Sequence, residues 1–191
     1  MPTNRVRIIG GEWRSRRISF PSREDLRPTP DRVRETLFNW LGQDLTGKVC
    51  LDLFAGSGAL GFEAASRGAK RVVMVERDAA TLKALQATSA QLGAVAVELI
   101  RADALEFLRG DCGCYDVIFL DPPFTAGYRL RLLPLVLPHM APGALVYCES
   151  AERPQLTGGW EVWKQGRAGQ VHFQLLKRTE HEQQSGISGD V

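Results

Sequence analysis

Four consecutive residues, Asp121-Pro122-Pro123-Phe124, have the types and order that could hold a flat amino group during an alkyl transfer. An amino group on an aromatic ring is a weak nucleophile, because its lone pair is delocalised into the ring. The Asp121 carboxylate and the Pro122 carbonyl could each accept one N–H hydrogen bond and aim the lone pair. Pro123 would stiffen the loop, and Phe124 could stack on the ring. The tetrapeptide predicts a centre for methylating an exocyclic amine, in which Asp121 either takes the released proton or only positions the amine.

A glycine-rich loop is the second feature that could do chemistry. Residues 52–61 read DLFAGSGALG, in which Gly56 and Gly58 permit a sharp turn close to a ligand and Gly61 permits close packing of the following helix. The spacing is also the dinucleotide fingerprint, with Glu76 where a ribose-binding acid is expected. The loop by itself therefore leaves a nicotinamide cofactor and S-adenosylmethionine as alternatives.

Two further acids favour S-adenosylmethionine. Asp52 precedes the loop and could attract the amino group of a methionine moiety, while Asp103 could accept a hydrogen bond from the adenine N6 amine. With Glu76 they would all lie at the C-terminal ends of expected strands, where open α/β sheets bind ligands. The candidate cofactor-binding residues are Asp52, Phe54, Gly56, Ser57, Gly58, Glu76, Arg77, Asp103 and Ala104.

The elements that must position these residues alternate between strand and helix from residue 48 onward. The apolar patterns predict strands at 49–54, 71–76, 97–101, 115–120 and 144–148, with helices at 60–67, 79–92, 104–108 and 130–140. This alternation is typical of a parallel sheet covered on both faces. Residues 160–164 and 171–177 alternate around two glycines and predict a closing β-hairpin.

The N-terminal region has a different pattern. Residues 5–9 and 16–20 alternate around Gly10-Gly11, which predicts a small basic hairpin. Thr29 is the expected N-cap and Pro30 the first residue of an amphipathic helix over 30–41, with Arg32, Arg34 and Asn39 away from its apolar face. We therefore divide the chain into a basic hairpin and linker (1–29), a catalytic domain with its leading helix (30–179) and a flexible tail (180–191).

Charge is concentrated in the first 34 residues, which contain nine arginines and four carboxylates, whereas the whole chain carries only +2. Arginine suits phosphate binding and base stacking, so the cluster favours a polyanion partner, although a solvated basic face is the alternative. The candidate RNA-binding residues are Arg5, Arg7, Arg14, Arg16, Arg17, Arg27 and Arg32.

Composition excludes several classes of protein. The chain has 44% hydrophobic and 24% charged residues, typical of a globular domain, and it has neither a long apolar run nor the apolar segment of a signal peptide. We therefore expect a cytoplasmic protein. The four cysteines lack zinc-clip spacing, so we expect reduced thiols and no metal.

Four segments together resemble a known family. DLFAGSGALG and VIFLDPPF are similar to the cofactor loop and catalytic motif of amino-group methyltransferases, while RIIGGEWRSRRI and RPTPDRVRETLFNWL are similar to the bacterial 16S ribosomal RNA (guanine-N2)-methyltransferase family of the RsmD type. The resemblance spans residues 5 to about 178; many relatives have a glycine or another small residue in place of Ser15. It implies a Rossmann-like class I S-adenosylmethionine-dependent fold with seven strands, the last antiparallel. It also implies that the substrate is the 16S rRNA of a partly assembled small ribosomal subunit. We expect the enzyme to be a monomer.

Other functions remain as alternatives at this point. A DNA or RNA adenine-N6 or cytosine-N4 methyltransferase would use the same tetrapeptide, but the chain has no separate target-recognition domain. A protein-glutamine methyltransferase would leave the arginines unexplained. A nicotinamide-dependent dehydrogenase would need an acid for hydride transfer, and neither His139 nor His172 lies in a recognisable site. A non-catalytic RNA-binding protein would not need Asp121.

Overall fold

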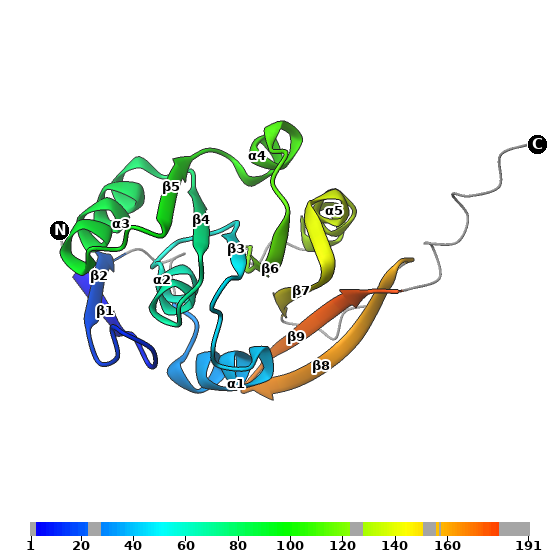
Figure 1. Cartoon of the computed structure of the whole chain (residues 1–191), viewed down its shortest axis with the longest axis horizontal. Coiled ribbons are helices and arrows are strands. Elements are labelled where there is room, and N and C mark those ends of the chain that lie inside the picture. The colour runs from blue at the N-terminus through cyan, green and yellow to red at the C-terminus, as the bar shows by residue number, and fades with distance from the viewer. Residues whose placement is uncertain (1–2, 23–27, 123–127, 151–155, 157, 180–191) are drawn as a thin grey trace, which may run out of the picture.

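A mixed α/β fold is seen in the computed structural model, which describes residues 3–22, 28–122, 128–150, 156 and 158–179 (Figure 1). Its strands are β1 (Thr3–Arg7), β2 (Arg17–Pro21), β3 (Val49–Asp52), β4 (Arg71–Glu76), β5 (Val97–Arg101), β6 (Tyr115–Leu120), β7 (Met140–Ser150), β8 (Trp160–Ala168) and β9 (Val171–Arg178). Its helices are α1 (Asp31–Leu41), α2 (Ala59–Ser66), α3 (Ala79–Leu92), α4 (Ala104–Gly110) and α5 (Tyr128–Val136), followed by a short 3-10 turn, Leu137–His139.

The main sheet has seven strands in the order β5-β4-β3-β6-β7-β9-β8. The first five are parallel, and β9 runs antiparallel to both β7 and β8. The expected seven-stranded, mostly parallel sheet with an antiparallel last strand is confirmed. The strand order reverses between β3 and β6, and open α/β sheets bind their ligands beyond the strand ends at such a point.

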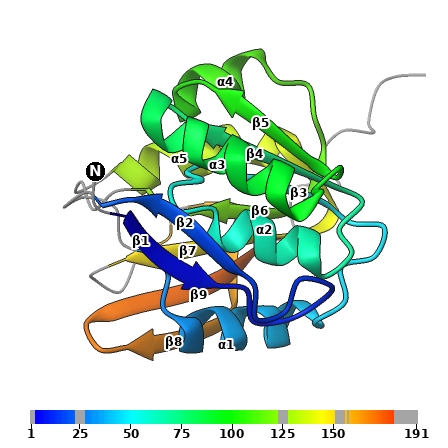
Figure 2. The same ribbon diagram turned by 90° about the vertical axis from the view of Figure 1, so that its left-hand side faces the viewer.

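Each face of the sheet has its own apolar core (Figure 2). The β1–β2 hairpin, α1, α2 and α3 cover one face, where Phe119 and Tyr147 contact the core. The helices α4 and α5 cover the other, packing on Leu120 and Cys148. No helix in the described ranges combines the length and the apolar character needed to cross a membrane.

The N-terminal hairpin is two-faced, as its alternation predicts. Val6, Ile18 and Phe20 are buried against the body, whereas Arg5 and Arg17 point to solvent. β1 and β2 pair antiparallel, with Arg7 directly opposite Arg17. Figure 2 shows the hairpin lying across α2 and α3. One side of the hairpin is therefore core and the other is a basic surface.

The turn of this hairpin contains one residue with an unusual backbone. Ser15 has a φ of 68°, in the left-handed region that costs most L-residues about 1–2 kcal/mol. Glycine adopts this conformation freely. A glycine at this position would therefore relieve the backbone strain.

The start of α1 differs from the sequence prediction. Pro30, not Thr29, is the N-cap, and no side chain caps the helix. The Thr29 hydroxyl is instead hydrogen-bonded to Glu149, and this tertiary contact replaces the local cap. The helix over 130–140 was also predicted too long: α5 ends at Val136, and Met140 already begins β7.

Arg34 was expected on a solvent-facing side of α1, but its side chain is fully buried. The guanidinium donates to Glu63 (3.2 Å), Asp31 (2.6 Å) and the Thr29 carbonyl (3.1 Å). Pairing with carboxylates makes the burial of such a charge tolerable. The prediction failed because helical periodicity cannot reveal a partner that lies 29 residues away.

Glu63 of α2 is the centre of this buried cluster. It accepts hydrogen bonds from the backbone N–H groups of Ile9 and Gly10, both at 2.8 Å, and pairs with Arg34 and Arg67. The carboxylate therefore joins the hairpin, α1 and α2 through one side chain.

Candidate active site

A row of carboxylates lies along one edge of the sheet, where five adjacent parallel strands end. In spatial order these acids are Asp103 after β5, Glu76 of β4, Asp52 of β3, Asp121 after β6 and Glu149 of β7. Neighbouring strands lie about 4.8 Å apart, so the row forms one continuous edge. Four of the five were predicted from sequence, and the fold brings them together at the switch point.

The glycine loop between β3 and α2 has the backbone that its residues predict. Gly56 and Gly58 have φ values of 50° and 80°, and Gly58 is the N-cap of α2. A Cβ on Gly61 would lie 2.6 Å from the sulfur of Met74 on β4. The glycines therefore permit both the sharp turn and the close contact of α2 with the sheet.

Asp52 holds the glycine loop in place, a structural role that the sequence did not suggest. Its carboxylate is buried and accepts hydrogen bonds from the backbone N–H groups of Phe54 and Gly61. Burial raises the pKa of Asp52 to about 7, partly offset by these hydrogen bonds. Asp52 thus fixes both ends of the loop.

Glu76 is partly exposed and also supports the loop. One of its oxygens accepts from the Gly56 N–H at 3.0 Å and the other from the Asp78 N–H at 2.8 Å. Each carboxylate oxygen has a second lone pair, so Glu76 retains capacity for ligand hydroxyls. Its position at the sheet edge is the one expected for a ribose-binding acid.

The remaining candidate cofactor residues are also at this edge. Asp103 is partly exposed and caps α4, accepting from the Leu105 N–H at 2.9 Å. Phe54 is partly exposed and Arg77 is exposed. Ser57 and Ala104 are buried, and the Ser57 hydroxyl accepts from the Ala59 N–H at 3.3 Å. The side chains of Phe54, Arg77 and Asp103 can therefore contact a ligand, whereas those of Ser57 and Ala104 are too buried to do so.

Asp121 directly follows β6, and its neighbour Pro122 is buried. Burial raises the pKa of Asp121 well above its ordinary value, and the nearby charges of Glu149 and Asp52 act in the same direction. A carboxyl group with a raised pKa is a better proton acceptor when ionised. Pro123 and Phe124, the other members of the predicted reaction centre, lie outside the described residues.

Glu149, on the strand beside Asp121, was not identified from the sequence. It is buried and accepts hydrogen bonds from the hydroxyls of Tyr147, at 2.7 Å, and Thr29. Burial raises the pKa of Glu149, while both hydrogen bonds oppose the rise. An acid at the end of an apolar strand, Val146–Cys148, was the signal that could have found it.

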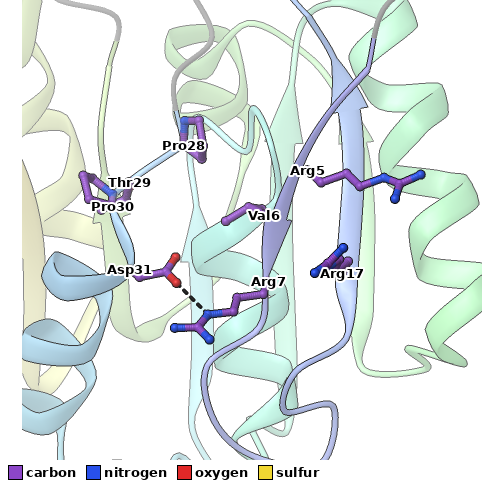
Figure 3. A pocket seen from close by; sticks show the side chains of 8 residues that line it. All are labelled: Arg5, Val6, Arg7, Arg17, Pro28, Thr29, Pro30 and Asp31. Atoms are coloured by element: carbon purple, nitrogen blue, oxygen red, sulfur yellow. Dashed lines mark hydrogen bonds and ion pairs between the residues drawn. The ribbon is translucent and has the colours of Figure 1, made fainter.

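A groove lies between the hairpin and the start of α1, with a volume of about 380 Å³ (Figure 3). Arg5, Arg7 and Arg17 line one side, and the segment 28–31 lines the other. Arg7 donates to Asp31 at 2.7 Å, as the dashed line in Figure 3 shows. In the described part of the chain Arg5 and Arg17 have no ion-pair partner, so their charges are available to a ligand.

The other candidate RNA-binding residues differ in their surroundings. Arg14 and Arg32 are exposed, and Arg16 donates to the Gln91 carbonyl at 3.2 Å. Arg27 lies outside the described residues. Arg14, Arg16 and Arg32 are thus basic residues outside the lining of the groove.

No group of three or more potential metal ligands occurs among the residues that the structure describes. All four cysteines are free thiols; Cys50 and Cys148 are buried, and Cys112 and Cys114 are exposed. The site is therefore built from carboxylates, backbone amides and arginines.

Comparison with known proteins gives consistent relationships. The family described as Conserved hypothetical protein 95 matches residues 6–177. Ribosomal RNA small subunit methyltransferase D of Escherichia coli (strain K12) is 39% identical and that of Haemophilus influenzae 40%, with at least 90% of both chains covered in each case. A solved putative methyltransferase, yhhF from Escherichia coli, is 40% identical with a TM-score of 0.82, over 92% of this chain and 98% of that one.

A more distant neighbour shows the fold alone. An RNA methyltransferase from Salinibacter ruber, solved with S-adenosyl-L-homocysteine, is 22% identical with a TM-score of 0.64, over 78% of this chain and 92% of that one. The expected Rossmann-like class I fold is confirmed.

Proposed function

We propose a reaction for this chain, which belongs to the Conserved hypothetical protein 95 family and is similar to ribosomal RNA small subunit methyltransferases D over about nine-tenths of its length. It transfers a methyl group from S-adenosylmethionine to the exocyclic N2 amine of a guanine in 16S rRNA. The observation that carries this proposal is the row of acids along the sheet edge, in which Asp52 and Asp121 flank the switch point.

The order of residues along the sheet edge fits S-adenosylmethionine. Asp103, Glu76 and the glycine loop follow one another on β5, β4 and β3. The cofactor has its adenine, ribose and sulfonium in the same linear order. Asp103 would accept from the adenine amine and Glu76 from the ribose hydroxyls, which leaves the sulfonium between the loop and Asp121.

The residues of the chain supply position and a proton acceptor. S-adenosylmethionine supplies a methyl group that its positive sulfur has already activated. The Asp121 carboxylate and the Pro122 carbonyl accept hydrogen bonds from the two N–H groups of the guanine amine and direct its lone pair at the methyl carbon. Asp121 lies where it can receive the proton that the nitrogen loses. Phe124 would stack on the base and Pro123 would stiffen the loop.

The RNA is held by the arginines of the hairpin. Arg5, Arg7 and Arg17 at the groove would contact phosphates beside the target guanine, with Arg14, Arg16, Arg27 and Arg32 extending the surface. We place the enzyme in the cytoplasm, acting as a monomer on a partly assembled small subunit.

Methyl transfer with a tritiated cofactor tests this function. The purified chain should label bacterial small subunits from a strain that lacks the modification and should not label subunits that already carry it. Digestion and mass spectrometry should identify the product as N2-methylguanosine. Labelling of an adenine N6 or a cytosine N4 would support the alternative amino methyltransferase and overturn the guanine assignment.

The groove arginines should contribute measurably to the salt dependence of RNA binding. Replacing Arg5 and Arg17 together with glutamine should lower the slope of log affinity against log salt by about 1.4–1.8, because each lost phosphate contact contributes about 0.7–0.9. Filter binding of small subunits at several salt concentrations would measure the slope.

The double variant Arg109→Gln and Arg131→Gln is the matched control. It removes the same charge from α4 and α5 on the opposite face of the sheet, where both side chains are exposed. The control should retain the wild-type slope. Equal slopes for both double variants would remove the groove from the RNA-binding surface.

A further inference from the structure

Glu149 lies beside Asp121 but has no role in the reaction proposed above. Leu120 of β6 pairs with Cys148 of β7 in parallel register, so Asp121 and Glu149 are the next residues on adjacent strands. Paired residues of parallel strands point to the same face of the sheet. Both acids therefore follow Phe119 and Tyr147 on the face that α1 covers.

Two hydroxyl groups favour the charged form of the Glu149 carboxylate. Tyr147 donates to Glu149 Oε1 at 2.7 Å, and Thr29 donates from the segment that leads into α1. Hydrogen bonds to a carboxylate favour its charged form. For Asp121 no hydroxyl donor of this kind is found among the described residues.

Two neighbouring carboxylates resist being ionised together, and the one with fewer hydrogen-bond donors binds a proton more strongly. Glu149 accepts from two hydroxyl donors, so Asp121 is the acid that binds the proton more strongly. The charge of Glu149 raises the pKa of Asp121, in addition to the effect of burial. Electrostatics and contacts thus agree on which acid binds the proton.

We propose that Glu149 is a positioning residue of the reaction centre: held as a carboxylate by Thr29 and Tyr147, it makes Asp121 basic enough to take the proton that the amine releases. This inference rests on the proposed function. In the balanced step the amine nitrogen forms its bond to the methyl carbon, the C–S electron pair goes to sulfur, and one N–H proton moves to Asp121, which later passes it to water.

A titration of Asp121 must be interpreted with the other titratable groups near Glu149 in mind. Tyr147 lies on the same strand as Glu149, Thr29 on the segment before α1 and Asp121 directly after β6, with Asp52 beyond on β3. The residue opposite Glu149 on β9 is Phe173, which does not titrate. Asp52, whose pKa is about 7, must be distinguished from Asp121 in any measurement.

The substitution Glu149→Gln tests the proposal, because it removes the charge and keeps the shape. A unit charge about 6 Å away at an effective dielectric constant of about 20 changes a neighbouring pKa by about 2 units. The Asp121 carboxyl signal, followed by ¹³C NMR and assigned with Asp121→Asn, should therefore titrate about one to two pH units lower than in the wild type.

Single-turnover methyl transfer should show the same change in a second way. Asp121 must be ionised to accept a proton, so the rate rises with pH through the Asp121 pKa. In Glu149→Gln this rise should move to lower pH, and the plateau should fall about tenfold because Asp121 is a weaker base, while the Kd for S-adenosylmethionine stays within about threefold.

Glu161→Gln on β8 is the matched control, because Glu161 is exposed and pairs only at the surface with Lys177. It should titrate and react like the wild type.

Thr29→Val and Tyr147→Phe each remove one donor and should shift the Asp121 midpoint even if Glu149→Gln folds poorly. An unchanged Asp121 midpoint in all three site variants overturns the role of Glu149. A wild type that transfers no methyl overturns the proposed function instead, and the NMR titration still decides this inference.

Discussion

Replacing Asp121 with alanine is expected to lower the rate of methyl transfer by at least about 100-fold, the lower end of the contribution of a positioned proton acceptor. The loss has two causes, because the amine loses both an acceptor that aims its lone pair and the group that receives its proton. Asp121 lies beyond the strands that would hold the adenine and ribose, so cofactor affinity should change less than threefold. Single-turnover kinetics and calorimetric titration with S-adenosylmethionine would measure the two effects separately.

Asp116→Asn is a suitable control for this variant. Asp116 lies on β6, the strand that Asp121 follows, but at the other end of this strand, where it accepts from Lys48 and from the Val49 N–H. Its replacement should leave the rate within about twofold of wild type. A fully active Asp121→Ala protein would contradict the catalytic assignment, whereas equal loss of cofactor binding would indicate a structural role.

The largest effect on stability is expected from Glu63→Gln. Both Glu63 and Arg34 are fully buried, and loss of the Glu63 charge leaves Arg34 with Asp31 as its remaining carboxylate partner and removes the carboxylate that pairs with Arg67. Breaking a buried pair in this way costs about 3–5 kcal/mol of the free energy of unfolding. For a chain of this size the Tm should fall by roughly 10 °C, measured by circular dichroism or calorimetry.

Glu98→Gln is the matched control for stability. Glu98 pairs with Arg71 at 2.6 Å, but about half of each side chain is exposed. Exposed pairs contribute about 0–1 kcal/mol, so the control should melt close to the wild type. If Glu63→Gln were as stable as Glu98→Gln, the buried cluster would contribute little to the fold.

Periodic and local features of the structure were predicted well from the sequence. The strands at 71–76, 97–101 and 115–120 and the helix at 79–92 have the predicted bounds, because apolar periodicity and a capping glycine determine them locally. The edge that collects Asp52, Glu76, Asp103 and Asp121 followed from strand order, since parallel strands end on the same side.

Features that depend on distant partners were not predicted. Arg34 looked like a surface residue because Glu63, its partner, is remote in sequence. Thr29 looked like a helix cap because the alternative acceptor, Glu149, lies 120 residues away in the chain. Glu149 itself belongs to no local motif. In each case the decisive contact crosses elements, and neither spacing nor propensity reports it.

The two sides of the N-terminal hairpin are under separate constraints. Its inner side contributes Val6, Ile18 and Phe20 to the core, and its loop gives two amides to Glu63. Its outer arginines contribute little to that packing. If the outer arginines bind RNA as proposed, substitutions there would change which RNA is recognised while the hairpin stays packed, so substrate preference can diverge during evolution without a loss of fold.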